Sequence, residues 1–341
     1  MASGRVVALA VICASILFPA GASAQDDFFA NKTLKIVVGY PPGSTFDLYA
    51  RALSRHMGRH LAGHPTVIVQ NMPGAGGLNA VKFVAGAAVK DGLTLALSNP
   101  QSTTAPLLDP KSANFDPRKF NWLGSLSDDT TVCAFWAKDI RTADDLAKRE
   151  IVIGATGITG GSAIDGRLLN ELFGLRFKIV TGYPGMIEVR LAAERGEVDG
   201  QCGLPGSTIK IDLMDQVASG KITVPVQLGL RPNPDLPAVP NVLDRISSPE
   251  EKAIFRLVYA PLSYMRPVMA PEGVPADRVA SLRAAFSATL VDKIFLAEMA
   301  AIKLDVRPVS HEMITSLISE IYDAPKPIVE RVQRLLGVEG R

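Results

Sequence analysis

The sequence is poor in cysteine, lacks an excess of either charge and has no apolar run of membrane-spanning length after its first residues. Three cysteines in 341 residues exclude a small fold held together by disulfides. A count of 36 basic and 34 acidic residues gives a net charge of +2. The chain thus lacks the excess of basic residues that is typical of nucleic-acid-binding proteins, and it has no acidic tail. Hydrophobic residues make up 47%, so we expect a globular chain of about two domains.

The motifs of common enzyme classes are also absent. The sequence contains no Gly-x-Ser-x-Gly elbow, no His-Glu-x-x-His pair, no phosphate loop and no dinucleotide fingerprint. His56, His60 and His64 recur every four residues, which is a spacing that metal sites use. Gly63 and Pro65 end that segment, so we interpret the histidines as part of a solvated helix face. We therefore expect no metal, no cofactor and no catalytic residue.

Residues 1–24 have the form of a secretory signal peptide. An uncharged apolar run at residues 6–18 is followed by small residues that end at Ala24, where we expect cleavage. The run is too short for a stable membrane anchor, so we expect an exported protein. Cleavage would leave Cys133 and Cys202, which either pair in an oxidising compartment or remain two buried small hydrophobic side chains.

Strands and helices alternate along the rest of the chain. Residues 34–40, 66–70 and 93–98 are typical of buried strands, and amphipathic helices are expected at 44–61 and 79–90. This order predicts right-handed crossovers and a mostly parallel sheet. We expect a second α/β block, followed by two final helices, with elements at 142–148, 151–154, 162–173, 177–181, 186–195, 198–202, 222–228, 310–322 and 327–336.

Three glycine-rich loops are candidates for binding an anion. They lie at residues 41–45, 73–77 and 156–162, and two of them lead directly into an expected helix. A helix N-terminus has unpaired N–H groups and the positive end of the helix dipole, so it binds carboxylate or phosphate without needing arginine. The alternative is that these glycines and hydroxyl residues only form turns and helix caps.

One short stretch of sequence is echoed later in the chain. Residues 35–43 (KIVVGYPPG) are similar to residues 178–185 (KIVTGYPG), and each reads as a strand that ends in Gly-Tyr-Pro. The echo is either chance convergence on the same strand–turn–helix pattern or a sign of two lobes. In the second case each lobe offers a tyrosine, Tyr40 or Tyr183, at the carboxyl edge of its sheet, where open α/β sheets bind ligands.

Six segments carry a resemblance to a known family, and the resemblance covers nearly all of the chain after residue 24. They are 35–51 (KIVVGYPPGSTFDLYAR), 67–78 (VIVQNMPGAGGL), 90–98 (KDGLTLALS), 157–173 (GITGGSAIDGRLLNELF), 180–203 (VTGYPGMIEVRLAAERGEVDGQCG) and 270–286 (APEGVPADRVASLRAAF). In motif, order and spacing the chain resembles the substrate-binding proteins of tripartite tricarboxylate transporters, also called the Bug family.

The resemblance implies an α/β, periplasmic-binding-protein-like (type II) fold. Each of its two lobes is a mostly parallel sheet flanked by helices, and the ligand cleft lies between the lobes. We expect residues 25–133 to form the first part of lobe 1, residues 134–261 to form lobe 2, and residues 262–341 to be a helical segment that returns to lobe 1.

The implied function is that of a periplasmic, non-enzymatic receptor. It would capture a small organic carboxylate and deliver it to a membrane transporter, and we expect a monomer that binds no nucleic acid. One alternative is a binding protein of the same fold for a neutral or amide-bearing solute that is nicotinamide- or amino-acid-like. Another is a secreted hydrolase, for which the sequence offers no nucleophile–base pair.

The loops and the resemblance together give the candidate ligand-binding residues. In lobe 1 they are Tyr40, Pro42, Gly43, Ser44, Thr45, Asp47, Ala75, Gly76, Ser98 and Asn99. In lobe 2 they are Gly157, Thr159, Gly160, Gly161, Ser162, Tyr183, Gly185 and Asp199. Ser44 and Thr45 stand where the family more often has a further glycine, so the preferred ligand is expected to differ from the family's commonest pattern.

Overall fold

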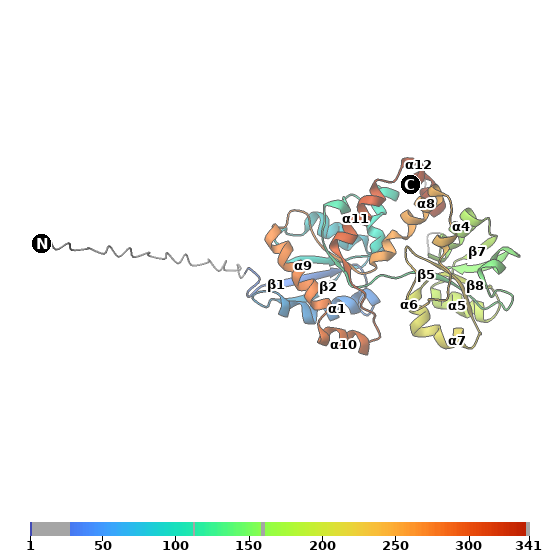
Figure 1. The fold of residues 1–341 in the computed structure, drawn as a ribbon, viewed down its shortest axis with the longest axis horizontal. Helices are drawn as coiled ribbons and strands as arrows, with labels where there is room; N and C mark the ends of the chain where they lie inside the picture. The colour runs from blue at the N-terminus through green and yellow to red at the C-terminus, as the bar shows by residue number, and fades with distance from the viewer. Residues whose placement is uncertain (2–27, 112, 158–160, 339–341) are drawn as a thin grey trace.

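The structure is a computed structural model, and it describes residues 1, 28–111, 113–157 and 161–338. Except for Met1, the predicted signal peptide lies outside the described residues. The described chain forms two α/β lobes side by side, each built on one sheet (Figure 1). None of its helices is long and apolar enough to cross a membrane.

The sheet of the first lobe is mixed. Its strands lie in the order β11-β4-β10-β3-β1-β2, in which β1 pairs in parallel with β2 and β3 while β10 is antiparallel to both of its neighbours. Val38 lies opposite Asn71 and Leu97, so the carboxyl ends of the three parallel strands meet at one edge. The strands are β1 Thr33–Val38, β2 Thr66–Asn71, β3 Thr94–Leu97, β4 Asn121–Ser125, β10 Pro267–Ala270 and β11 Val309–Ser310.

The sheet of the second lobe repeats this arrangement in the order β7-β6-β8-β5-β9. Here β6 pairs in parallel with β7 and β8, and the inserted antiparallel strand is β5. The strands are β5 Thr131–Phe135, β6 Ile151–Ala155, β7 Phe177–Thr181, β8 Gly200–Pro205 and β9 Thr223–Leu228. The echoed sequences lie at non-equivalent positions, since β1 is an inner strand of its sheet and β7 is an edge strand.

Helices cover both faces of each sheet. The α-helices are α1 Thr45–Met57, α2 Leu78–Lys82, α3 Ala105–Leu108, α4 Gly161–Phe173, α5 Met186–Glu194, α6 Gly206–Thr208, α7 Met214–Ala218, α8 Pro249–Tyr259, α9 Ala276–Leu290, α10 Lys293–Ala301, α11 His311–Tyr322 and α12 Lys326–Leu336. Shorter 3-10 or π turns are η1 Gly58–His60, η2 Ala75–Gly77, η3 Phe83–Ala87, η4 Pro100–Thr103, η5 Pro117–Lys119, η6 Ala143–Ala147, η7 Ile209–Leu213, η8 Val242–Arg245 and η9 Ala260–Tyr264.

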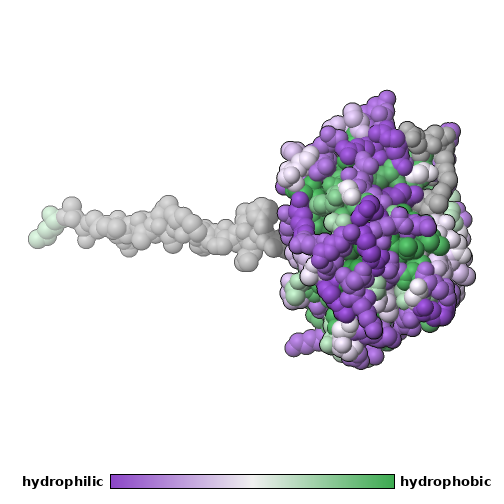
Figure 2. Space-filling view, turned by 90° about the vertical axis from the view of Figure 1, so that its right-hand side faces the viewer, coloured by the Kyte–Doolittle hydropathy of each residue, from purple (hydrophilic) through white to green (hydrophobic). Residues whose placement is uncertain are grey.

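The helices of the first lobe bury two apolar clusters. α1, α9 and α10 pack on one face of its sheet, and α2 and α11 pack on the other. Figure 2 shows the face that the second lobe presents: hydrophilic side chains are spread over it, and hydrophobic ones form small separate patches.

The chain passes between the lobes three times. It first crosses from β4 to β5, and it returns through α8 and η9 to β10. α11 lies on the first lobe, but α12 buries Ile328, Val332 and Leu335 in the core of the second lobe together with α4 and α8. Residues 262–341 were expected to return to lobe 1, but their last helix, α12, packs on lobe 2.

Cys133 on β5 and Cys202 on β8 form a disulfide bond. Both residues are fully buried, and their strands are neighbours in the second sheet. Of the two possibilities that the sequence left open, the structure has the paired form.

The prediction that the histidines of α1 lie on a solvated face is wrong for His56. Its side chain is buried, its ring lies 5.5 Å from that of Phe295, and its Nε2 lies 2.6 Å from Glu298 Oε2. The apolar stripe of α1 packs against α9 and α10, and this contact carries the neighbouring His56 into the interface. No cluster of potential metal ligands occurs among the residues that the structure describes.

Candidate functional site

Loops of the first lobe meet at the carboxyl edge of β1, β2 and β3. The Tyr40 hydroxyl donates to the Gly76 carbonyl oxygen over 3.2 Å. Asn99 Nδ2 donates to the Tyr40 hydroxyl over 2.7 Å and to the Gly76 carbonyl oxygen over 3.0 Å. The structure thus brings together one predicted site residue from each of the three strand-end loops.

The loop after β1 leads directly into α1. Ser44 caps the helix, because its Oγ accepts the Asp47 amide over 3.3 Å. Gly43 has a φ of +82°, a left-handed conformation that favours glycine, and nothing lies within 4 Å of the place of a Cβ. Pro42 and Gly43 are exposed. The backbone of this loop is therefore open to an approaching ligand.

Asp47 braces the same loop from inside. Its carboxylate accepts the Gly43 amide, Arg51 Nε and Asn71 Nδ2, each over 2.8 Å. Burial raises the pKa of Asp47, but the hydrogen bonds from Arg51, Gly43 and Asn71 outweigh that effect and leave the pKa below its ordinary value. The side chain is 1% exposed, so Asp47 positions the loop and does not face the cleft.

Gly39 explains how the second loop lies so close to the first. A Cβ on Gly39 would lie 2.5 Å from the Cα of Gly77, so only glycine lets η2 rest on the end of β1. This approach places Ala75 and Gly76 beside Tyr40. Ser98, at the end of β3, is buried, and its Oγ has no hydrogen-bond partner among the described residues.

In the second lobe the predicted residues fall into two groups. Ser162 is buried in the first turn of α4, where its Oγ donates to the Gly154 carbonyl oxygen over 2.6 Å and accepts the Cys202 amide over 3.1 Å. Gly161, Tyr183 and Gly185 are at least partly exposed beyond the carboxyl ends of β6 and β7. Gly157 lies in the same loop as Thr159 and Gly160, which are outside the described residues.

The structure does not bring Asp199 to these loops. Its carboxylate accepts Nη1 and Nη2 of Arg149 over 2.8 Å each and the Val152 amide over 2.7 Å. Asp199 precedes β8 and lies beside the start of β6, whereas the loop that follows β6 leaves from the other end of that strand. Its oxygens are thus engaged at the far edge of the sheet.

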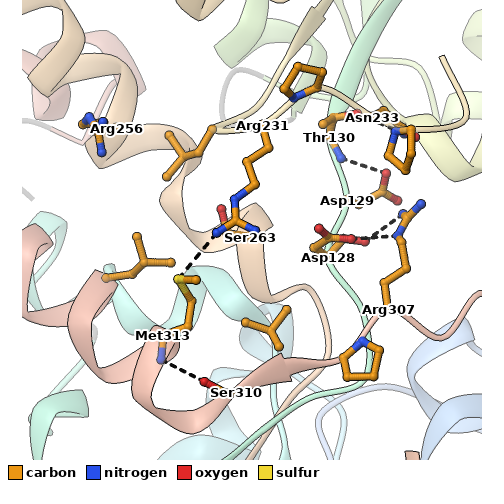
Figure 3. Close-up of a pocket in the computed structure, with 16 residues that line it drawn as sticks. Asp128, Asp129, Thr130, Arg231, Asn233, Arg256, Ser263, Arg307, Ser310 and Met313 are labelled. Atoms are coloured by element: carbon orange, nitrogen blue, oxygen red, sulfur yellow. Dashed lines mark hydrogen bonds and ion pairs between the residues drawn. The ribbon is translucent and has the colours of Figure 1, made fainter. Parts of the chain in front are cut away.

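Two cavities lie where the lobes face each other. One, of 210 Å³, is lined by Thr45 and Tyr49 of α1 and by Ser207 and Thr208 of α6, so both lobes contribute to it. The other, of 600 Å³, contains none of the predicted site residues (Figure 3). Asp128, Asp129 and Arg307 line both cavities, and the Arg307 Nε–Asp128 Oδ1 pair of 2.7 Å lies between them.

Three residues at this edge were not among the predicted site residues. The ring of Phe46 stacks on that of Tyr40 with centroids 4.4 Å apart, and Asn71 Nδ2 donates to the Tyr40 carbonyl oxygen over 2.9 Å. Asn71 ends a parallel strand, which is the same signal that identified Ser98 and Asn99. Arg266 lines the smaller cavity, and no local motif distinguishes it.

No family model matches the chain. One curated relative is protein BugT of Bordetella pertussis, which is 37% identical over 102 residues, or 30% of this chain and 28% of BugT. A solved TctC solute-binding protein from Polaromonas matches 90% of this chain and 98% of its own, with a TM-score of 0.70 and 16% identity. In sequence and in fold, the chain is a relative of the Bug proteins. The resemblance inferred from the sequence motifs is confirmed.

Two further structures define the fold of this Bug relative. The periplasmic binding protein BugD matches 90% of this chain and 98% of its own, with a TM-score of 0.59 and 23% identity. An R. palustris protein with adipate matches 90% and 97%, with a TM-score of 0.60 and 19% identity. The predicted two-lobe periplasmic-binding-protein fold is confirmed. The sequence matches cover less than a third of the curated relatives' own lengths.

Proposed function

We propose that this Bug relative is a periplasmic solute-binding protein without enzymatic activity. It takes a small organic carboxylate between its lobes and delivers it to a membrane transporter of the tripartite tricarboxylate type. One observation carries the proposal: the strand-end loops of lobe 1 converge beside the capped N-terminus of α1, which lines a cavity shared with lobe 2.

The backbone supplies the chemistry of this site. The N-terminal amides of α1 lack partners within the helix and lie at the positive end of its dipole. An anion that binds there while touching lobe 2 has more contacts when the lobes are closed, and this differential affinity drives closure. The R. palustris structure with adipate supports a carboxylate as the class of solute.

The remaining predictions complete the proposal. Residues 1–24 are the signal peptide, residues 25–130 and 262–322 belong to lobe 1, and residues 131–261 together with α12 belong to lobe 2. The disulfide between Cys133 and Cys202 supports an oxidising compartment such as the periplasm. We expect the receptor to act as a monomer. The amide-solute alternative would need Asp199 to accept a hydrogen bond from the amide N–H of the solute. It loses support because the Asp199 carboxylate is held by Arg149.

Thermal unfolding of the mature protein tests the proposal. The panel is adipate, succinate, citrate, benzoate and glutamate, each with its amide counterpart as a control. A ligand at a hundredfold excess over its Kd stabilises the folded state by about 2.7 kcal/mol. We expect at least one acid to raise the Tm and its amide to leave the Tm unchanged. The proposal is overturned if no acid shifts the Tm, or if the acids and amides shift it equally.

A further inference from the structure

An arginine without a carboxylate partner lies at the boundary between the lobes. Arg266 directly precedes β10, at the end of the second crossing. Its Cζ lies 4.4 Å from the ring centroid of Phe46 and 5.2 Å from that of Tyr49. Phe46 in turn stacks on Tyr40, so a continuous stack connects the guanidinium with the strand-end loops of lobe 1.

The hydrogen-bonding groups of Arg266 are only partly used. Nη1 donates to the Met265 carbonyl oxygen over 3.0 Å, while Nε is buried and has no partner among the described residues. No described carboxylate forms an ion pair with this guanidinium, whereas the nearby Arg307 pairs with Asp128 and Asp235. A buried charge is costly unless it is paired, so the site is incomplete as it stands.

Three of the four carboxylates that line the same cavity are engaged with other groups, and the fourth, Asp212, is exposed and forms no ion pair with Arg266 within the described part of the chain. Asp129 accepts the Ser207 hydroxyl over 2.7 Å and the Thr130 amide over 2.8 Å. Asp305 pairs with Lys210 over 3.1 Å, and Asp128 pairs with Arg307. Arg266 therefore forms no direct ion pair with a described carboxylate, and the charge of Asp129 acts on it only at longer range, in a cavity that also contains Thr45 of the α1 N-terminus.

We propose that the positively charged guanidinium of Arg266 binds a carboxylate of the solute. This guanidinium lies over the Phe46 ring and lines the cavity between the lobes, where its remaining N–H groups can meet the solute. A planar fork of this kind pairs with a carboxylate through two hydrogen bonds. This inference rests on the proposed function, and it adds a fixed positive charge to a site otherwise built from backbone amides and hydroxyls.

The test compares the wild type with R266Q and R266K by isothermal titration. The probe is whichever acid of the panel adipate, succinate, citrate, benzoate and glutamate binds the wild type most tightly. We expect R266Q to bind that acid about 10- to 100-fold more weakly, because a charged hydrogen-bonding partner is lost. R266K should fall in between, since it retains the charge without the fork.

R283Q is the matched control, because Arg283 is also half-buried in lobe 1 and donates to a carbonyl oxygen, that of Trp122, away from the cavity. Its affinity should equal that of the wild type. If R266Q binds the acid as well as the wild type does, this inference is overturned and the proposed function stands. If the wild type binds no acid of the panel, both are overturned.

A second measurement uses the wild type and does not depend on whether R266Q folds. In NMR spectra of protein labelled in arginine, the Nε–H signal of Arg266, assigned with R266K, should move when the tightest acid saturates the protein. A signal that stays in place at saturation contradicts a role for Arg266 in binding.

Discussion

Asp165 is a buried carboxylate of α4 that joins distant parts of the chain. It accepts the Tyr259 hydroxyl over 2.7 Å, the Thr131 hydroxyl over 2.8 Å and the Gly203 amide over 2.9 Å. Burial raises the pKa of Asp165 to about 6, and the hydrogen bonds from Tyr259, Thr131 and Gly203 only partly oppose that rise. Thr131 and Tyr259 lie next to the first two crossings, so this carboxyl group is close to both.

The titration of Asp165 predicts a specific pH dependence of stability. A carboxyl group whose pKa is higher in the folded state stabilises that state fully below the unfolded pKa of about 4, and loses this effect as the pH rises through about 6. The unfolding free energy of the wild type relative to D165N should thus fall by about 2 kcal/mol between pH 4 and pH 7. Urea unfolding at several pH values measures this difference.

The exposed Asp277 provides the control for this comparison. D277N should follow the pH profile of the wild type. A constant difference between the wild type and D165N across the range would contradict the assigned pKa.

Asp47 is the residue on which the order of the first loop depends. In D47A the Gly43 amide, Arg51 and Asn71 all lose their acceptor, and because water can reach these partly exposed groups, we expect a net loss of about 1–2 kcal/mol. We expect the unfolding free energy to fall by that amount and the affinity for the tightest acid of the panel to fall as well. Chemical unfolding and titration measure the two effects. If D47A binds the acid as tightly as the wild type does, the hydrogen bonds of Asp47 are not required to hold the loop in its binding conformation.

At the scale of elements, the disulfide links the inserted strand β5 to the parallel strand β8. The two cysteines are 69 residues apart in sequence, so the bond closes a long loop in the unfolded chain. Loop-closure entropy for such a loop corresponds to about 4 kcal/mol, and measured effects are typically about 2–4 kcal/mol. The double variant C133A/C202A should lose stability in that range.

The reducing agent dithiothreitol provides the comparison. When the wild type is unfolded in dithiothreitol and then refolded, its urea midpoint should be lower than without the reductant. The midpoint of C133A/C202A should be the same with and without dithiothreitol. Equal midpoints for oxidised wild type and the double variant would contradict a stabilising bond.

The sequence predicted elements best where an apolar run has clear ends. β7 occupies the predicted residues 177–181, because Gly174 precedes the strand and Gly182 follows it. The strands β4 and β5 were not predicted, since each is short and β5 pairs only with strands that lie at least 65 residues later in the chain. Long-range pairing of this kind leaves no local periodicity to detect.

The same limit applies to the candidate site. Tyr40, Gly76 and Asn99 were each predicted from a loop or a strand end, and they meet in the structure because each follows a parallel strand and such ends share one edge. The expected strand 198–202 begins two residues before β8, and this offset hid the position of Asp199 at the amino end of the strand. Arg266 enters the cavity through a crossing whose path depends on the packing of both lobes, which no local motif encodes.

At the scale of the whole molecule, ion pairs join the lobes across the cleft. Lys210 of η7 lies 3.1 Å from Asp305, which follows α10 in lobe 1, and 3.2 Å from Asp235. The Lys210 side chain is 41% exposed, so solvent screens the pair and its contribution is about 0.5–1 kcal/mol. This amount is still sufficient to shift an equilibrium between open and closed lobes.

K210M should therefore favour the open form. We expect a larger radius of gyration in small-angle X-ray scattering of the ligand-free protein, and an affinity for the tightest acid about two- to fivefold weaker. K221M is the matched control, because Lys221 pairs with Glu194 inside lobe 2. Unchanged scattering and affinity in K210M would show that this pair has no part in closure.

The three crossings also restrict how the lobes can move. Tyr322, at the end of α11, packs against the apolar clusters of both lobes just before α12 enters the second lobe. A joint made of one strand permits torsion as well as bending, whereas several connections along a boundary leave a single axis of rotation. Successive closures should then bring the same faces opposite one another, so that the two halves of the cleft keep their alignment each time the molecule closes.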